Sequence, residues 1–337
     1  MTDRARVVSG MRPTGRLHLG HLVGALGNWV PLQSQYECFY FVADWHALTS
    51  DFADTTQLTT YSYDNVADWI GAGLDPEKST FFVQSLVPEH AELYLLLSMV
   101  VPVPWLERVP TYKEQQENLK DKDLSSIGFL GYPLLQTADV SLYDARFVPV
   151  GEDQVAHLEL AREAVRRFNN VFGAGDRPPL VEPQPLLTKF GRLPGLDGDK
   201  KMSKSLGNTI HLSDSADEVK KKVMRMYTDP KRVRADIPGT VEGNPVFVYH
   251  DAFNPNTAEV EDLKARYRGG TVGDVEVKTK LASALNAHLD PIRDRRATAL
   301  AKPERLKEIL FEGSKRARVE AEKTMTRVRD AMKISYK

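Results

Sequence analysis

The chain has 337 residues, of which 42% are hydrophobic and 27% charged, and this composition excludes a largely disordered or low-complexity protein. Its one cysteine, Cys38, excludes an internal disulfide, a zinc ribbon and a cysteine-ligated iron–sulfur cluster, so we expect a protein of the reducing cytoplasm. The net charge of −1 conceals a polarity: residues 1–200 carry 17 Lys+Arg against 26 Asp+Glu, whereas residues 201–337 carry 28 against 20.

The amino-terminal residues do not form a secretory signal, because no long apolar core follows the first charged residues. The most apolar stretch, Leu93–Leu106, contains two prolines and is too short to span a bilayer. We therefore expect no membrane insertion.

Short β-rich runs alternate with helical stretches in the first half of the chain. Strands are predicted at Val7–Met11, Glu37–Asp44 and Ser79–Gln84, and helices at Leu17–Leu32, Thr55–Ile70, Glu89–Val100, Tyr132–Leu142 and Asp153–Asn169. This alternation predicts an α/β fold with a parallel sheet, in which functional side chains follow the carboxyl ends of the strands.

Residues 173–200 are rich in glycine and proline and have no apolar period, which predicts a connector. After it, helical periodicity appears in Ala216–Met226, Val275–Leu289 and Pro303–Met332. We predict a sheet-containing domain over residues 1–200 and an all-helical domain over residues 201–337. The positive charge of the second domain suggests nucleic acid as a partner, although solvated basic helices are a commoner reason for such charge.

The first strand is followed by residues 12–21, Arg-Pro-Thr-Gly-Arg-Leu-His-Leu-Gly-His, a turn that runs into a helix. His18 and His21 are three positions apart and so share one face of its first turn. There the helix dipole and backbone N–H groups favour a phosphate, and Gly20 allows close approach. Two histidines that merely decorate a helix start remain the alternative.

A second cationic element, Asp-Lys-Lys-Met-Ser-Lys-Ser, occupies residues 199–205 between glycines. Its lysines and hydroxyls can close over a triphosphate and neutralise the leaving pyrophosphate. By itself this loop would be read as a solvated basic linker.

Together, the early His-Leu-Gly-His and the late Lys-Met-Ser-Lys-Ser resemble the two signatures of class I aminoacyl-tRNA synthetases. Further stretches at residues 41–49, 132–139 and 148–154 resemble bacterial-type tryptophanyl-tRNA synthetases, and the resemblance extends from Ser9 to about Lys333. It implies a Rossmann-like catalytic domain with dimer-interface helices, followed by a helical anticodon-binding domain that begins with the lysine loop.

The same resemblance implies where the substrates bind. The candidate catalytic residues are His18, His21, Lys113, Lys201 and Lys204. The candidate ATP-binding residues are Arg12, Pro13, Thr14, Gly20, His21, Gly151, Glu152, Asp153, Leu193, Lys201, Met202, Ser203, Lys204 and Ser205. The candidate tryptophan-binding residues are His46, Tyr132, Gln136, Asp139 and Gln154.

Amino-acid recognition has a physical rationale. Tyr132, Gln136 and Asp139 are spaced to line one helix face. An ammonium group needs acceptors, which Tyr132, Gln136 and Gln154 supply, and an indole N–H donates only, so a buried Asp139 carboxylate is a specific acceptor for it.

Gln136 complicates the choice of amino acid, because some bacterial tryptophan enzymes have methionine there and Tyr-x-x-x-Gln-x-x-Asp also resembles the tyrosine site of tyrosyl-tRNA synthetases. A tyrosyl-tRNA synthetase is therefore the first alternative. A small-molecule nucleotidyltransferase and a non-catalytic RNA-binding or regulatory paralogue are the others.

The resemblance implies a tryptophan–tRNA ligase reaction. ATP, as its Mg²⁺ complex, and L-tryptophan would form tryptophanyl-AMP, and tRNA(Trp) would then accept the acyl group. A homodimer is implied as well, with no protein-bound metal and no iron–sulfur cluster.

Overall fold

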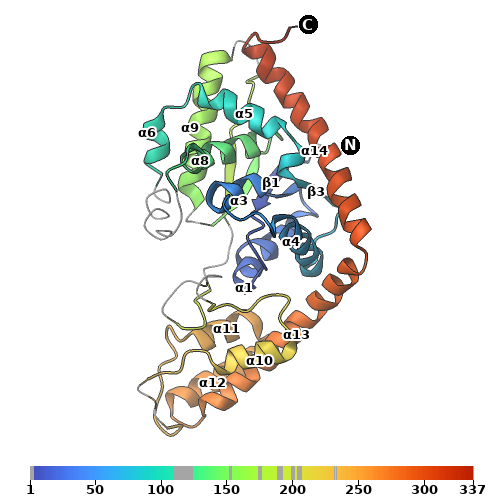
Figure 1. The fold of residues 1–337 in the computed structure, drawn as a ribbon. Coiled ribbons are helices and arrows are strands. Elements are labelled where there is room, and N and C mark those ends of the chain that lie inside the picture. The colour runs from blue at the N-terminus through green and yellow to red at the C-terminus, as the bar shows by residue number, and fades with distance from the viewer. Residues whose placement is uncertain are drawn as a thin grey trace.

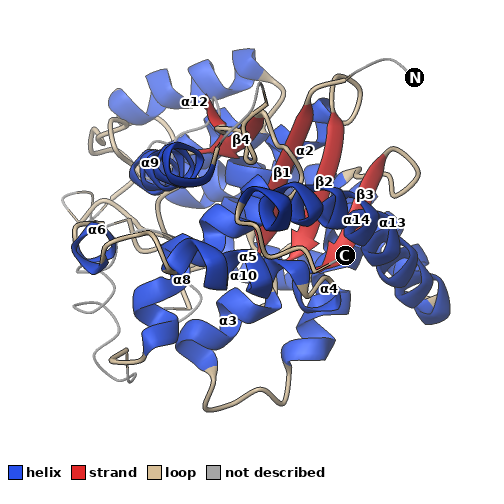
Figure 2. Cartoon of the chain, turned by 90° about the horizontal axis from the view of Figure 1, so that it is seen from above, coloured by secondary structure: helices blue, strands red, loops and turns tan. Residues whose placement is uncertain are grey.

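The computed structural model describes residues 4–109, 124–151, 154–173, 177–187, 193–198, 202, 207–230, 232 and 234–336. Their centre is a five-stranded sheet in the order β3-β2-β1-β4-β5, with every neighbouring pair parallel. Figure 2 shows β1, β2 and β3 side by side. The strands are β1 (Arg6–Met11), β2 (Glu37–Val42), β3 (Ser79–Val83), β4 (Phe147–Val150) and β5 (Gln184–Leu187). The predicted parallel α/β fold is confirmed.

The strand β5 corrects the prediction of a structureless connector over residues 173–200. It pairs with β4 through registers such as Val148↔Pro185. Proline is tolerated on an edge strand, and all four residues of β5 are at least partly exposed, so no apolar alternation marked it in the sequence.

The helices between the strands largely follow the predicted spans. The predicted helix at 17–32 is one helical run whose middle, η1, has π-helical hydrogen bonding. The elements are α1 (Leu19–His21), η1 (Leu22–Leu26), α2 (Gly27–Leu32), α3 (Asp44–Asp51), α4 (Leu58–Ala72), the 3-10 turn η2 (Gln84–Leu86), α5 (Glu89–Ser98), α6 (Val103–Glu107), α8 (Ile127–Ser141) and α9 (Val155–Phe172).

The elements assigned after residue 200 are all helices, as predicted. They are α10 (Ala216–Met224), α11 (Pro245–Phe253), α12 (Thr257–Arg268), α13 (Asp274–Leu300) and α14 (Pro303–Ala331). Neither α11 nor α12 was predicted from the sequence. Six of the nine residues of α11 are buried, so this helix lacks a polar face. No helix of the described residues has the length and apolarity needed to cross a membrane.

The last helix returns to the sheet. Figure 1 shows α14 running from the lower helices back along the upper part of the molecule, and α14 packs against the edge strand β3. The Ser314 hydroxyl accepts from the Val83 backbone N–H at 3.2 Å, and α13 packs against α4. Helices from the second half of the chain thus stabilise the sheet-containing first half. The predicted domain boundary at residue 200 stays a prediction.

Candidate active site

The carboxyl ends of the parallel strands gather polar residues at one edge of the sheet. Arg12 follows β1, α3 with His46 follows β2, Gln84 follows β3 and Gly151 follows β4. The chain lays β2 and β3 on one side of β1 and then β4 on the other. Such a reversal opens a crevice at the strand ends, so the ligand site is expected beside β1 and β4.

His18 and His21 form a compact pair at the start of α1, with ring centroids 3.9 Å apart. The Gly20 N–H donates to His18 Nδ1 at 3.1 Å, and the His18 N–H donates to His21 Nδ1 at 3.2 Å. Each Nδ1 is therefore an acceptor, which places the proton of the neutral ring on Nε2.

The backbone at this helix start differs from the expectation. The N–H groups of Leu19, Gly20 and His21 already donate to Ile210 O, His18 Nδ1 and His18 O. They are used to fix the turn, so the predicted role of these N–H groups in binding a phosphate is not supported by the structure.

Residues flanking the second signature lie against the first. The Leu19 N–H donates to Ile210 O at 3.0 Å and the Leu212 N–H donates to Leu17 O at 3.0 Å, which pairs the two segments like short antiparallel strands. A β-carbon added at Gly20 would lie 3.4 Å from Met202 Sδ. The structure thus brings Met202 to Gly20, and Leu193 belongs to the same buried cluster.

The Arg12 side chain is tied to the end of α3. Its Nη2 donates to Ser50 Oγ at 2.6 Å and to Asp51 Oδ2 at 3.1 Å.

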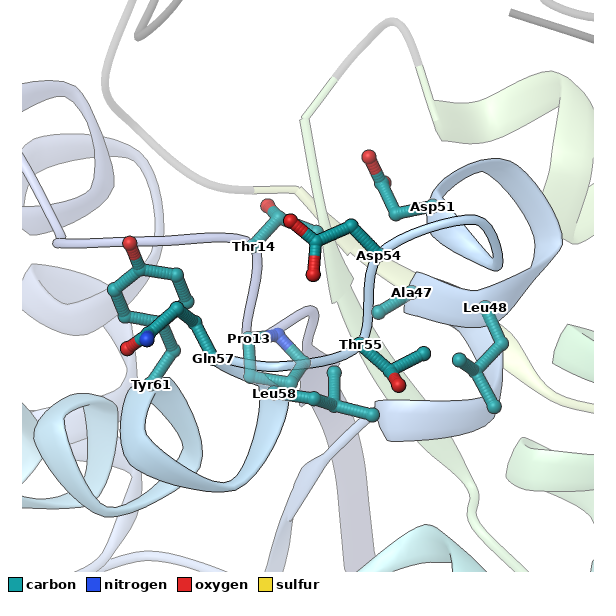
Figure 3. Close-up of a pocket in the computed structure, with 10 residues that line it drawn as sticks. All are labelled: Pro13, Thr14, Ala47, Leu48, Asp51, Asp54, Thr55, Gln57, Leu58 and Tyr61. Atoms are coloured by element: carbon teal, nitrogen blue, oxygen red, sulfur yellow. The ribbon is translucent and has the colours of Figure 1, made fainter.

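A pocket of about 180 Å³ opens beside Pro13 and Thr14 (Figure 3). This volume is below the range usual for sites of drug-sized ligands, so the pocket by itself does not accommodate a nucleotide.

Asp139 on α8 is the centre of a buried hydrogen-bond network and is 1% exposed. Its Oδ2 lies 2.7 Å from His46 Nε2, and its Oδ1 lies 2.7 Å from both Gln84 Nε2 and His90 Nδ1. The other ring nitrogen of His90 lies 2.7 Å from the Tyr143 hydroxyl. Of the predicted residues, the structure brings His46 and Asp139 into direct contact.

These contacts set the charge of Asp139. Burial raises the pKa of its carboxyl, but the charge and hydrogen bonds of His46 and His90 oppose burial and lower the pKa to about 2. The carboxyl is therefore ionised at neutral pH, and because it then has no proton it can only accept hydrogen bonds. Three donors use three of its roughly four acceptor positions, which leaves capacity for one more.

Of the other predicted amino-acid contacts, Tyr132 and Gln136 lie on α8, and Gln154 directly precedes α9. Tyr132 lies on α8 with its ring centroid 5.5 Å from that of His157 on α9, whereas Asp139 is held from α3 and α5. Tyr132, Gln136 and Gln154 are each partly exposed. These three side chains are thus accessible, in contrast to Asp139.

Several predicted site residues lie outside the described residues. They are Lys113, Glu152, Asp153, Lys201, Ser203, Lys204 and Ser205.

The sequence reasoning missed Gln84, His90 and Tyr143. Gln84 stands directly after β3, where the strand-end rule predicts functional residues, so that rule could have found it. His90 had no such signal, because only the packing of α5 on α8 brings it to Asp139. Tyr143 stands four residues after Asp139, but its contact with His90 depends on the same packing.

Comparison with known proteins identifies one family, and two of the most similar curated relatives have the same name. The family model described as tRNA synthetases class I (W and Y) matches residues 1–290. A tryptophan–tRNA ligase of Treponema pallidum (strain Nichols) is 50% identical, with 98% of this chain and 97% of that protein covered. One from Thermotoga maritima is 49% identical, with 98% and 100% covered.

Solved structures of synthetases from the same family also resemble this chain. The tryptophanyl-tRNA synthetase of Campylobacter jejuni complexed with ADP and tryptophan superposes with a TM-score of 0.86 at 34% identity, covering 97% of this chain and 99% of the other. A tyrosyl-tRNA synthetase of Archaeoglobus fulgidus has a TM-score of 0.67 at 23% identity, covering 88% and 91%, and shares the fold.

Proposed function

Since the chain belongs to the class I tRNA synthetases of the tryptophan and tyrosine group, and within it to the tryptophan–tRNA ligases, we propose that it joins L-tryptophan to tRNA(Trp) with ATP. The observation that carries this function is near-50% identity to such ligases over 98% of the chain. The buried, ionised Asp139 supports it, because an indole N–H needs an acceptor.

In the first step, a carboxylate oxygen of tryptophan attacks the α-phosphorus of ATP, and the bond to the pyrophosphate oxygen breaks. The nucleophile is already ionised, so the chain needs only to position it and to stabilise charge on the phosphates. His18 and His21 donate through Nε2, and Lys201, Lys204 and Lys113 neutralise the pyrophosphate. ATP enters as its Mg²⁺ complex, a substrate.

The substrate groups divide between the predicted residues. Arg12, Pro13, Thr14 and Gly20 border the phosphates, while Gly151, Glu152, Asp153 and Leu193 face the ribose and adenine. Tyr132, Gln136 and Gln154 accept from the ammonium group, and Asp139 beside His46 accepts from the indole N–H. In the second step a terminal ribose hydroxyl of the tRNA attacks the acyl carbon and AMP leaves.

The helical half is proposed to bind the tRNA. It carries the excess of positive charge, which favours phosphates. We assign residues 1–200 to the catalytic domain and 201–337 to the lysine loop and anticodon-binding helices, in a cytoplasmic protein.

A homodimer is proposed from exposed apolar side chains on and around the neighbouring helices α5, α6 and α8. Leu95 is 53% exposed, Met99 65%, Val103 53% and Ile127 82%. A second copy is the occupant that suits them, because the resemblance to tryptophanyl-tRNA synthetases implies a homodimer. Sedimentation should give twice the chain mass, and Met99→Glu should shift it toward the monomer.

An ATP–pyrophosphate exchange panel with the twenty amino acids tests the function. Tryptophan alone should drive exchange. Exchange driven by tyrosine would instead support the tyrosyl-tRNA synthetase, and no exchange with any amino acid would support the non-catalytic paralogue.

A further inference from the structure

The network around Asp139 extends beyond the residues that can touch a substrate. Gln84, His90 and Tyr143 are each 0% exposed, and His46, at 9%, is the most exposed side chain that bonds Asp139. The network is therefore fully buried on the Oδ1 side of Asp139, and its slight exposure lies on the Oδ2 side, where His46 is bonded.

The Oδ1 side is held by two groups with fixed orientation. Gln84 donates through Nε2 to Oδ1, while its own carbonyl oxygen faces the His46 backbone N–H at 3.4 Å. The His90 ring lies among Phe41, Phe82 and Tyr143, at centroid distances of 5.5 to 6.1 Å. Neither group can turn away without leaving a buried polar atom unpaired.

Tyr143 sets the direction of the hydrogen bonds. Burial, with the charges of Asp139 and Glu89, raises the pKa of its hydroxyl well above the usual value, so the hydroxyl keeps its proton. The hydroxyl can therefore donate to His90 Nε2, 2.7 Å away, while His90 Nδ1 on the other side of the ring donates to Asp139 Oδ1. Both contacts are then satisfied together.

We propose that His90, oriented by Tyr143, is a positioning residue for tryptophan selection: it fixes the Asp139 carboxylate through Oδ1, so that Oδ2 is presented to the indole N–H. This rests on the proposed function. His90 acts through Asp139 and does not touch the substrate.

The test compares L-tryptophan with β-(benzothiophen-3-yl)-L-alanine, in which sulfur replaces the indole N–H. Kinetics of ATP–pyrophosphate exchange are measured for both substrates in the full-length chain. His90→Leu removes the donor, whereas His90→Asn retains a side-chain N–H near the position of Nδ1. Tyr143→Phe removes only the hydroxyl. Tyr40→Phe is the matched control, because Tyr40 is equally buried and its hydroxyl donates to the Trp29 carbonyl, away from Asp139.

The preference for tryptophan, as the ratio of kcat/KM values, should fall about tenfold in His90→Leu and about threefold in Tyr143→Phe. The loss should appear mainly in KM for tryptophan, with the analogue nearly unaffected. His90→Asn should restore most of the ratio, and Tyr40→Phe should not change it. If His90→Leu does not fold, the ratio of kcat/KM values in the nearly isosteric Tyr143→Phe tests the inference.

If His90→Leu lowered kcat/KM equally for tryptophan and for the analogue, His90 would only support the fold. That result would overturn this inference but not the proposed function. Exchange in the unmodified chain driven by another amino acid and not by tryptophan would overturn the proposed function, and this inference with it.

Discussion

Met202 lies close to Gly20, and this contact places the second signature at the first. The described neighbours Ile210 and Leu212 bond the same turn on its other side. Met202, which stands between Lys201 and Lys204 in the sequence, is therefore the described residue that links the two signatures.

Lys201→Ala and Lys204→Ala should each slow adenylate formation by about 10²-fold or more, because the lysines meet charge that develops mainly in the transition state. Tryptophan binding should be nearly unchanged. Single-turnover kinetics and a tryptophan binding titration separate the two effects. Lys220→Ala, an exposed lysine on α10, is the control. Weakened tryptophan binding with an unchanged first-order step would contradict this role.

At the scale of elements, α14 packs on the edge strand β3 without space for a side chain at Gly313. A β-carbon there would lie 1.7 Å from the Phe81 carbonyl oxygen. The helix covers an edge that would otherwise expose unpaired backbone groups. The close approach requires glycine even though glycine weakens a helix.

Gly313→Ala should therefore lower the free energy of unfolding by about 2–4 kcal/mol, since α14 must move away from the strand. Arg316→Ala, an exposed position on the same helix, should change it by less than about 0.5 kcal/mol. Urea unfolding measures both. Equal stability of the two variants would show that α14 does not depend on this contact.

The contact between α4 and α13 predicts a pH dependence. Asp68 on α4 is 1% exposed and accepts from Arg296 Nε at 2.7 Å, and Asp64 shares the same guanidinium. Burial raises the pKa of Asp68 to about 6, although Arg296 opposes the shift. Between about pH 4 and 6 the folded chain thus holds a proton that the unfolded chain has lost.

The stability that Asp68 contributes should accordingly be greatest below about pH 4 and decline as the pH rises to 6, with no further change above it. Asp68→Asn removes this pH-dependent contribution, because an amide does not titrate. The difference in unfolding free energy between the original chain and Asp68→Asn should fall by a few kcal/mol across that window, as an order of magnitude. Parallel pH profiles of the two proteins would contradict the assignment.

At the scale of the whole molecule, the charge polarity predicts that the two half-reactions respond differently to salt. The basic side chains of the second half are not all available to a tRNA. Arg318 donates to the 4%-exposed Glu89 at 2.8 Å, so this arginine bonds the first half of the chain. It is unsuited to a charge-reversal test of RNA binding, because Arg318→Glu would disturb an internal ion pair.

Aminoacylation should weaken steeply with added salt, because each neutralised tRNA phosphate releases counterions. Adenylate formation uses small ligands and should depend much less on salt. Measuring both half-reactions over one salt series checks this. Parallel salt curves would mean that the positive charge of residues 201–337 does not serve tRNA binding.

The sequence by itself determined what depends on local periodicity and on contiguous motifs. The strands β1, β2 and β3 and the amphipathic helices have repeats that sterics and hydrophobic burial impose directly on the chain. The two signatures and the family followed from runs of neighbouring residues. The edge strand β5 and the mostly buried α11 have no such repeat, so they could not be predicted.

Only the tertiary structure decided what depends on distant residues meeting. Asp139 could be identified as an acceptor, but the partners that fix its charge and orientation, Gln84 and His90, come from positions 55 and 49 residues earlier. The pairing of Leu19 with Ile210 was equally invisible. Hydrogen bonds of this kind are set by how the helices pack across the sheet, and no local pattern of residues specifies that packing.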